Sequence, residues 1–110
     1  MTKPNGIRKS DDIDWFVDGL IRKNKLKMEK YEHPINGGSR TITETRYYVE
    51  RATLEKMAGE IYEVLDHDIW NVVQIIPISR KGPEYVELEI GHYMRGCVPA
   101  IMKWNFIYTD

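Results

Sequence analysis

The chain has 110 residues, of which 42% are apolar and 30% charged, and its net charge is −1 at pH 7. This length and balance predict a single globular domain over residues 1–110 with one core, preceded by a flexible segment over residues 1–9. A nearly neutral chain without an apolar run of about 20 residues argues against a strongly electrostatic nucleic-acid binder and against a membrane-spanning protein.

The start of the chain and the cysteine content bear on the cellular setting. The stretch "MTKPNGIRKSDD" has no apolar segment behind its basic residues, so we expect no secretory signal. Cys97 is the only cysteine, so the chain cannot form an intrachain disulfide or a zinc site made of thiolates alone. These features favour a reducing, cytoplasmic setting, and we expect no cofactor.

The first predicted element is a helix over residues 11–23, with Ser10 as its N-cap. Acidic residues in the first turn and basic residues in the last turn suit the helix macrodipole. Apolar residues recur at the spacing of one buried helix face: Ile13, Phe16, Val17, Leu20 and Ile21. Trp15 lies off this stripe, and we expect it to be an exposed aromatic residue.

Two alternating segments, residues 25–33 and 41–50, predict a β-hairpin. A two-residue turn would place Glu29 opposite Glu44, whereas a four-residue loop over residues 36–39 places Glu29 opposite Arg46. We therefore predict the longer loop. In this register the core side carries Leu26, Met28, Tyr47 and Val49. The outer side carries Lys27, Glu29, Tyr31, Glu44, Arg46 and Tyr48.

A second helix is predicted over residues 53–65, with Thr53 as a candidate N-cap. Its buried stripe consists of Leu54, Met57, Ala58, Ile61 and Leu65. Gly59 in the middle costs about 1 kcal/mol relative to alanine, which a close packing contact would explain. The apolar segment 69–79 then predicts a strand with both faces partly covered, in which Pro77 marks an end, a bulge or an edge.

Residues 84–94 and 100–109 alternate again and predict a second hairpin. One apolar face carries Val86, Leu88, Ile90 and His92, and the other carries Met102, Trp104, Phe106 and Tyr108. We expect Ile90 opposite Trp104 and Leu88 opposite Phe106, with His92 facing Met102. The connecting loop is then residues 95–99, with Cys97 at its tip.

These elements predict an α+β fold in the order α-β-β-α-β-β-β. A mainly antiparallel five-stranded sheet should carry the two helices on one face. The passage from the second strand through the second helix to the third strand is the one place where a parallel pairing could arise.

Candidate catalytic groups are few. Cys97 has Arg95 close by in sequence, but His92 is expected over the core edge rather than beside the thiol. Glu87 and Glu89 share one outward strand face, as polar residues on the wet side of a sheet do. An enzyme or small-ligand binder around His92, Cys97 and Glu89 is therefore the least favoured alternative.

The run Asp66-His67-Asp68 offers adjacent metal ligands whose side chains point in different directions. No HxH, HExxH or CxxC spacing accompanies it. We interpret the run as a polar helix exit and expect no metal site.

The aromatic content, with 3 Trp, 7 Tyr and 2 Phe, is the most suggestive feature. On strand faces predicted to point outward lie Tyr31, Tyr48, Tyr85 and Tyr93, with Arg46 beside Tyr48. Such side chains are favoured anchors at protein interfaces. The leading hypothesis is a non-enzymatic protein-binding module, an inhibitor or regulator, that binds a protein partner or associates with itself as a dimer.

The same face allows an alternative function, a single-stranded nucleic-acid binder in which tyrosine rings stack on bases. Its contact residues would be Lys25, Lys27, Arg46 and Tyr48 of the basic first hairpin. Glutamates on the outward faces would repel phosphates and count against this alternative.

Overall fold

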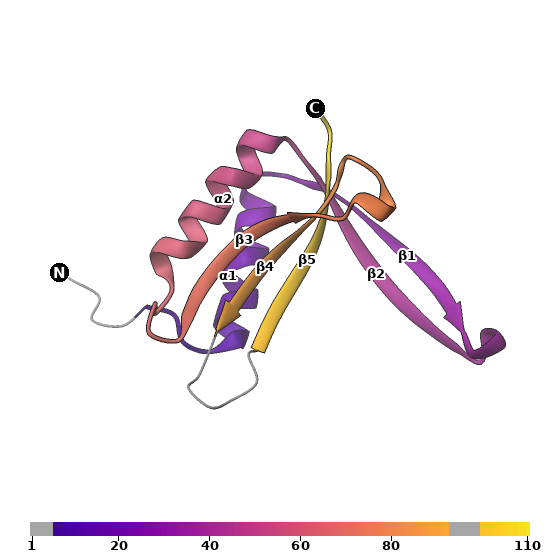
Figure 1. The fold of residues 1–110 in the computed structure, drawn as a ribbon, viewed down its shortest axis with the longest axis horizontal. Helices are drawn as coiled ribbons and strands as arrows, with labels where there is room; N and C mark the ends of the chain where they lie inside the picture. The colour runs from indigo at the N-terminus through magenta and orange to yellow at the C-terminus, as the bar shows by residue number, and fades with distance from the viewer. Residues whose placement is uncertain (1–5, 93–99) are drawn as a thin grey trace.

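The computed structural model describes residues 6–92 and 100–110. In this part of the chain, two helices pack on one face of a five-stranded sheet (Figure 1). The helices are α1 (Ser10–Lys23) and α2 (Arg51–Val64), and the strands are β1 (Lys27–Ile35), β2 (Arg40–Val49), β3 (Trp70–Pro77), β4 (Tyr85–His92) and β5 (Ala100–Tyr108). The predicted α+β class, element order and one-sided helix layer are confirmed. Tyr93, Arg95, Cys97 and the loop predicted over residues 95–99 lie outside the described residues.

The strands are arranged in the order β1-β2-β5-β4-β3. All neighbours are antiparallel except β2 and β5, which pair in parallel. The parallel pair is therefore β2–β5 and not the β2–β3 pair that the sequence allowed, because α2 leads the chain to β3 at the far edge. The β3–β4–β5 meander then returns to the middle, where Phe106 of β5 fills the core beside Val49 of β2.

Both helices bury the faces that their apolar spacing predicts. The buried helical residues include Ile13, Val17, Leu20, Ile21, Leu54, Met57 and Ile61, and they pack against Val86, Leu88, Ile90 and Phe106 of the sheet. Each fully buried aliphatic or aromatic side chain of this kind contributes about 1.5–3 kcal/mol. Trp15 is 72% exposed, as its place off the stripe predicts.

The starts of the helices differ from the prediction. Ser10 is the first residue of α1, with Lys9 in the cap position, and α2 starts before Thr53, with Glu50 in the cap position. Neither cap residue makes a side-chain hydrogen bond to its helix. β2 ends at Val49, and α2 begins almost directly after it. The first hydrogen bond of the helix is therefore the one that the Glu50 carbonyl accepts from the Leu54 N–H at 3.0 Å.

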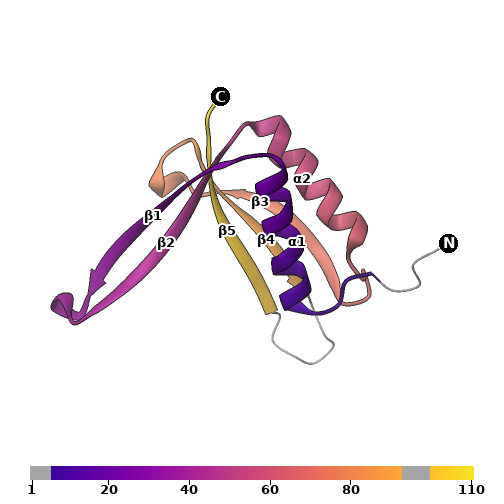
Figure 2. The ribbon, with the colours of Figure 1, turned by 180° about the vertical axis from the view of Figure 1, so that it is seen from behind.

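The first hairpin has the predicted register. Glu29 lies opposite Arg46 and Ile35 opposite Arg40, so the four-residue loop over residues 36–39 is confirmed. Beyond the helices this hairpin continues as a projecting two-stranded arm (residues 30–45) (Figures 1 and 2). Met28, predicted to face the core, is 50% exposed because it lies near this uncovered part. The radius of gyration of 15.4 Å exceeds the roughly 13 Å of a compact domain of this length.

The last hairpin has the predicted faces but a different register. Leu88 lies opposite Trp104 and Ile90 opposite Met102, two residues from the predicted pairing, and His92 lies opposite Ala100 rather than Met102. A shift by two residues keeps every side chain on its face, so alternation alone does not distinguish the registers. The observed register places Lys103 opposite Glu89.

Candidate functional site

The carboxylate of Glu44 forms the centre of a polar cluster on the outer face of the sheet. It accepts hydrogen bonds from the Tyr85 hydroxyl and from Arg46 Nε at 3.2 Å. His33 Nε2 lies 3.0 Å away and Lys81 Nζ 3.6 Å away. The Glu44 side chain is only 14% exposed, so several donors surround one shielded acceptor.

This environment changes the acidity of Glu44. Burial by itself would raise the pKa of the carboxyl, but the hydrogen bonds from Tyr85, Arg46 and His33 outweigh it and lower the pKa to about 2. Burial and the hydrogen bond to Glu44 also raise the pKa of Tyr85 to about 12. Glu44 is therefore a charged, fully engaged group at neutral pH.

A second carboxylate, Glu29, holds the neighbouring tyrosines. It accepts hydrogen bonds from the Tyr48 hydroxyl and from the Tyr31 hydroxyl at 3.1 Å, and both lower the pKa of Glu29. The Arg46 guanidinium carbon lies 4.0 Å from the Tyr31 ring centroid and 5.2 Å from that of Tyr85. These contacts fix the side chains in place as a preorganised aromatic surface.

The residues predicted to bind a partner are thus brought together in part. Tyr31, Arg46 and Tyr48 meet on the outer face of the hairpin. Tyr85 lies on the same face, but it is only 5% exposed because Lys81 and Arg46 lie against its ring, so the expectation of an accessible ring is wrong there. Tyr93 lies outside the described residues.

The residues of the nucleic-acid alternative are more scattered. Lys25 precedes β1 with a φ of 55°, and Lys27 Nζ lies 5.6 Å from the Tyr48 ring centroid. The charge of Arg46 is paired with Glu44. The cluster therefore presents no free guanidinium to a phosphate backbone.

The groups of the enzymatic alternative are not assembled in the described residues. Glu89 lies 3.8 Å from Lys103 Nζ and accepts a hydrogen bond from Gln74 at 3.3 Å. Only the backbone of His92 is described, and Cys97 lies outside the described residues. Glu89 is thus engaged in contacts across the sheet.

The Asp66-His67-Asp68 run is held apart by local contacts. Asp66 is buried and lies 3.3 Å from Arg8 Nε, whereas the His67 ring stacks on Tyr62 with centroids 4.1 Å apart. Among residues 6–92 and 100–110, no group of three His, Cys, Asp or Glu side chains could hold a metal ion.

A notch separates the arm from β5, a feature that the sequence pattern does not predict. The parallel ladder covers only residues 46–49 of β2 and 105–108 of β5, and the two strands then diverge (Figures 1 and 2). A cavity of about 480 Å³ lies between them, lined by Thr43 and Ile42 of the arm and by Lys103 and Trp104 of β5. We call this region the notch.

The hydrogen bonds at the end of the β2–β5 ladder show which backbone groups face the notch. Tyr108 N–H donates to the carbonyl of Glu84, just before β4, and Thr109 N–H donates to the carbonyl of Val49 in β2. Because successive residues of a strand point their backbone groups to opposite sides, Ile101 and Lys103 present theirs to the notch. The same alternation, counted from Val49, makes Thr41 and Thr43 face it from β2. Within the described chain no ladder reaches these four residues from the notch side.

The two outer edge strands of the sheet each contain a proline, unlike the strand segments that border the notch. Pro34 in β1 and Pro77 in β3 lie at positions whose nitrogens face away from the neighbouring strand, so they remove edge donors there. Prolines at such positions protect sheet edges from pairing with other chains. The notch edges, residues 40–45 and 100–104, contain no proline.

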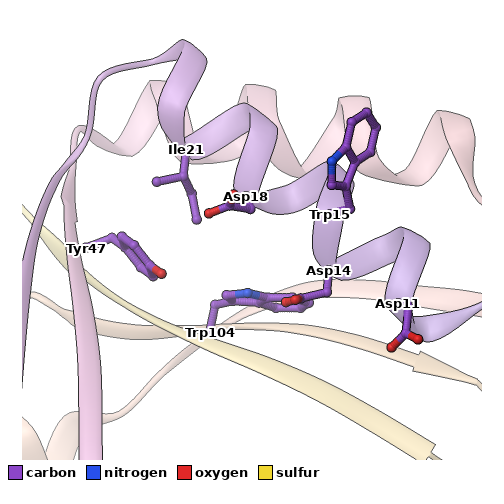
Figure 3. Close-up of a pocket in the computed structure, with 7 residues that line it drawn as sticks. All are labelled: Asp11, Asp14, Trp15, Asp18, Ile21, Tyr47 and Trp104. Carbon is purple, nitrogen blue, oxygen red and sulfur yellow. The ribbon is translucent and has the colours of Figure 1, made fainter.

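A second cavity of about 480 Å³, the acidic pocket, lies between α1 and the inner face of β2 and β5 (Figure 3). Three carboxylates and three aromatic rings line it, from Asp11, Asp14, Asp18, Trp15, Tyr47 and Trp104. Among these residues, the sequence pattern predicts only Trp15 to be exposed. The sequence does contain a pattern for the helical part of the pocket, because residues 11, 14, 15 and 18 have the i, i+3, i+4, i+7 spacing of one helix face.

No family model matches the chain, and no curated protein or solved structure shows significant similarity to it. Neither described helix is long and apolar enough to cross a membrane.

Proposed function

We propose that the chain is a non-enzymatic protein-binding module that accepts an extended segment of a partner protein in the notch. The observation that carries this proposal is a pair of strand edges that no ladder of the described chain pairs, with backbone groups of Thr41, Thr43, Ile101 and Lys103 on the sides that face each other. Thr43 and Lys103 also line the cavity between the two strands. Main-chain hydrogen bonds to such an edge provide affinity in strand addition, and side-chain pockets provide specificity.

The arm supports this proposal on energetic grounds. An isolated two-stranded hairpin is at best marginally stable in water, and neither helix and no third strand of residues 6–92 and 100–110 packs against the arm. A strand bound in the notch would supply that third strand. The arm would then gain hydrogen bonds and buried surface that the free chain does not provide.

Apolar side chains flank the notch on its outer side. Ile42 of the arm is 52% exposed and Ile101 of β5 is 51% exposed, and both point to the outer face of the sheet. Every second residue of an added strand would lie between them, so we expect apolar residues at these positions of the partner. The aromatic surface of Tyr31, Arg46 and Tyr48 lies on the same face and would contact the rest of the partner.

A matched pair of proline variants tests the proposal. Thr43→Pro removes an N–H that faces the notch, whereas Lys30→Pro removes one on the outer edge of β1, and both side chains are exposed. A partner captured from a cell lysate by the wild type should bind Lys30→Pro unchanged and Thr43→Pro about tenfold more weakly or worse. Equal binding to both variants would rule out strand addition at the notch.

Self-association and a separate partner protein are distinguished by the solution mass. A second copy of this chain in the notch would give a dimer that Thr43→Pro dissociates. A monomer whose capture depends on Thr43 indicates a different protein. Because this chain has a single cysteine, we propose that it meets its partner in a reducing, cytoplasmic setting. We propose that it acts there as a regulator or inhibitor of that partner.

A further inference from the structure

The acidic pocket combines two features that attract the same kind of ligand. Its aromatic lining consists of Trp104 and Tyr47 on the sheet and Trp15 on α1, and its carboxylates all come from α1 (Figure 3). Ring faces attract organic cations through their quadrupole, and carboxylates attract them through charge. A volume of about 480 Å³ is within the range of small-molecule sites.

Helix stability accounts for Asp11 through the macrodipole and for Asp18 through its i,i+4 ion pair with Arg22, but not for Asp14. The macrodipole favours carboxylates in the first turn, which explains Asp11 but not Asp14 or Asp18 farther along α1. Asp14 and Asp18 are spaced i, i+4, where like charges destabilise a helix by about 0.2–0.5 kcal/mol. Asp18 lies 3.3 Å from Arg22, whereas no ion pair of Asp14 occurs within residues 6–92 and 100–110.

The carboxylates of α1 interact electrostatically with Tyr47 in the aromatic lining of the pocket. Burial raises the pKa of the Tyr47 hydroxyl, and the charges of Asp18 and Asp14 raise it further. Carboxylates and rings therefore act on the same space between α1 and the sheet. Trp15 stands at the rim of the pocket with 72% of its surface exposed.

We propose that the acidic pocket binds an organic cation, an alkylammonium or guanidinium group. The group would lie against the faces of Trp104 and Tyr47 with its charge toward Asp14 and Asp18. The pocket shares Tyr47 and Trp104 with the notch, but its carboxylates and Trp15 belong to α1 and do not line the notch. The inference rests on these α1 residues, so it goes beyond strand addition and does not depend on it. Two sources share this chemistry, a basic side chain of a protein and a free small amine.

Nuclear magnetic resonance of the three indole N–H groups tests the proposal with an internal control. Trp15 and Trp104 line the pocket, whereas the Trp70 indole N–H donates to the Arg8 carbonyl at 2.8 Å, away from it. Choline and agmatine should shift the Trp15 and Trp104 signals saturably and leave Trp70 unchanged. The uncharged isostere of choline, 3,3-dimethyl-1-butanol, should not. Equal shifts with the uncharged isostere, or no saturable shift with either cation, would overturn the proposal.

Charge variants separate the pocket from a general acidic surface. Asp14→Asn combined with Asp18→Asn should weaken choline binding roughly fivefold, the effect of losing two exposed ion pairs. Asp12→Asn is the matched control, because Asp12 is exposed on α1 but does not line the pocket. Trp15→Ala should weaken binding about two- to fivefold. An effect of Asp12→Asn as large as that of the double variant contradicts the assignment.

Peptides then identify the source of the cation. Short peptides that contain lysine, trimethyllysine or arginine are titrated beside free choline and agmatine, with the same indole signals as the readout. Much tighter binding of a peptide assigns the pocket to a protein side chain. Equal or tighter binding of the free cations assigns it to a small molecule.

Discussion

Glu44→Gln tests whether the outer cluster depends on a charged carboxylate. The pKa of Glu44 falls from its usual 4.5 to about 2, a difference that corresponds to roughly 3 kcal/mol without screening. Because His33 and Lys81 are themselves 48% and 38% exposed, solvent screening reduces this to about 1–2 kcal/mol. We expect the variant to lose that amount of unfolding free energy at pH 7.

The lowered pKa of Glu44 determines how its contribution to the free energy of unfolding changes with pH. A carboxyl with a lowered folded-state pKa contributes stability that is fully present above about 4.5 and is lost as the pH falls toward 2. Urea denaturation from pH 7 to pH 2 should therefore show the wild type and Glu44→Gln converging in acid. Glu32→Gln on the exposed arm is the control and should run parallel to the wild type. A Glu44→Gln variant as stable as the wild type at pH 7, or a gap that persists at pH 2, would refute the reasoning.

Three further substitutions test the packing. Gly59→Ala should stabilise the chain by about 0.5–1 kcal/mol in thermal unfolding, because an added Cβ meets nothing within 4 Å, and a lower melting temperature would contradict this. Gly6→Ala should destabilise it by about 1–3 kcal/mol, since its Cβ would lie 2.2 Å from the Leu65 carbonyl carbon, and an unchanged melting temperature would show that the segment moves freely. Leu88→Ala should cost about 2–5 kcal/mol in urea denaturation, because the side chain is fully buried, and a cost below 1 kcal/mol would argue against the core packing described.

Local patterns predicted the local features of this fold. The apolar stripes of both helices are buried where their spacing places them. The register of the first hairpin was decided by the charges of Glu29, Glu44 and Arg46, and the structure has the same pairing. The same argument was open at the last hairpin, where Lys103 lies opposite Glu89, but there the register rested on apolar faces that a two-residue shift leaves unchanged.

Non-local features could not be predicted in this way. Alternation does not say which strand lies beside β2, so the parallel pairing of β2 with β5 could not be predicted. It also does not say where pairing ends, and the notch exists only because the β2–β5 ladder covers four residues. A close contact that would explain Gly59 is likewise not found among the described residues, since α2 exposes that position.

In the candidate sites, too, local patterns predicted the face on which a residue lies but not the residues it contacts. Outward strand faces predicted where Tyr31 and Tyr48 lie, but not that Glu29 would bind their hydroxyls. Tyr85 was placed on the correct face, yet its burial depends on Lys81, which comes from the turn before β4. The acidic pocket needed both the helix spacing and the position of Trp104 on a neighbouring strand.

Strand addition at the notch is tested most directly by backbone amide hydrogen exchange of the chain, alone and with its captured partner or at dimer-forming concentration. We predict slower exchange on binding at Thr43, Ile101 and Lys103, whose N–H groups face the notch, and unchanged exchange at Lys30 on the outer edge of β1. Protection at Lys30 with none at Thr43 or Lys103 would contradict the account.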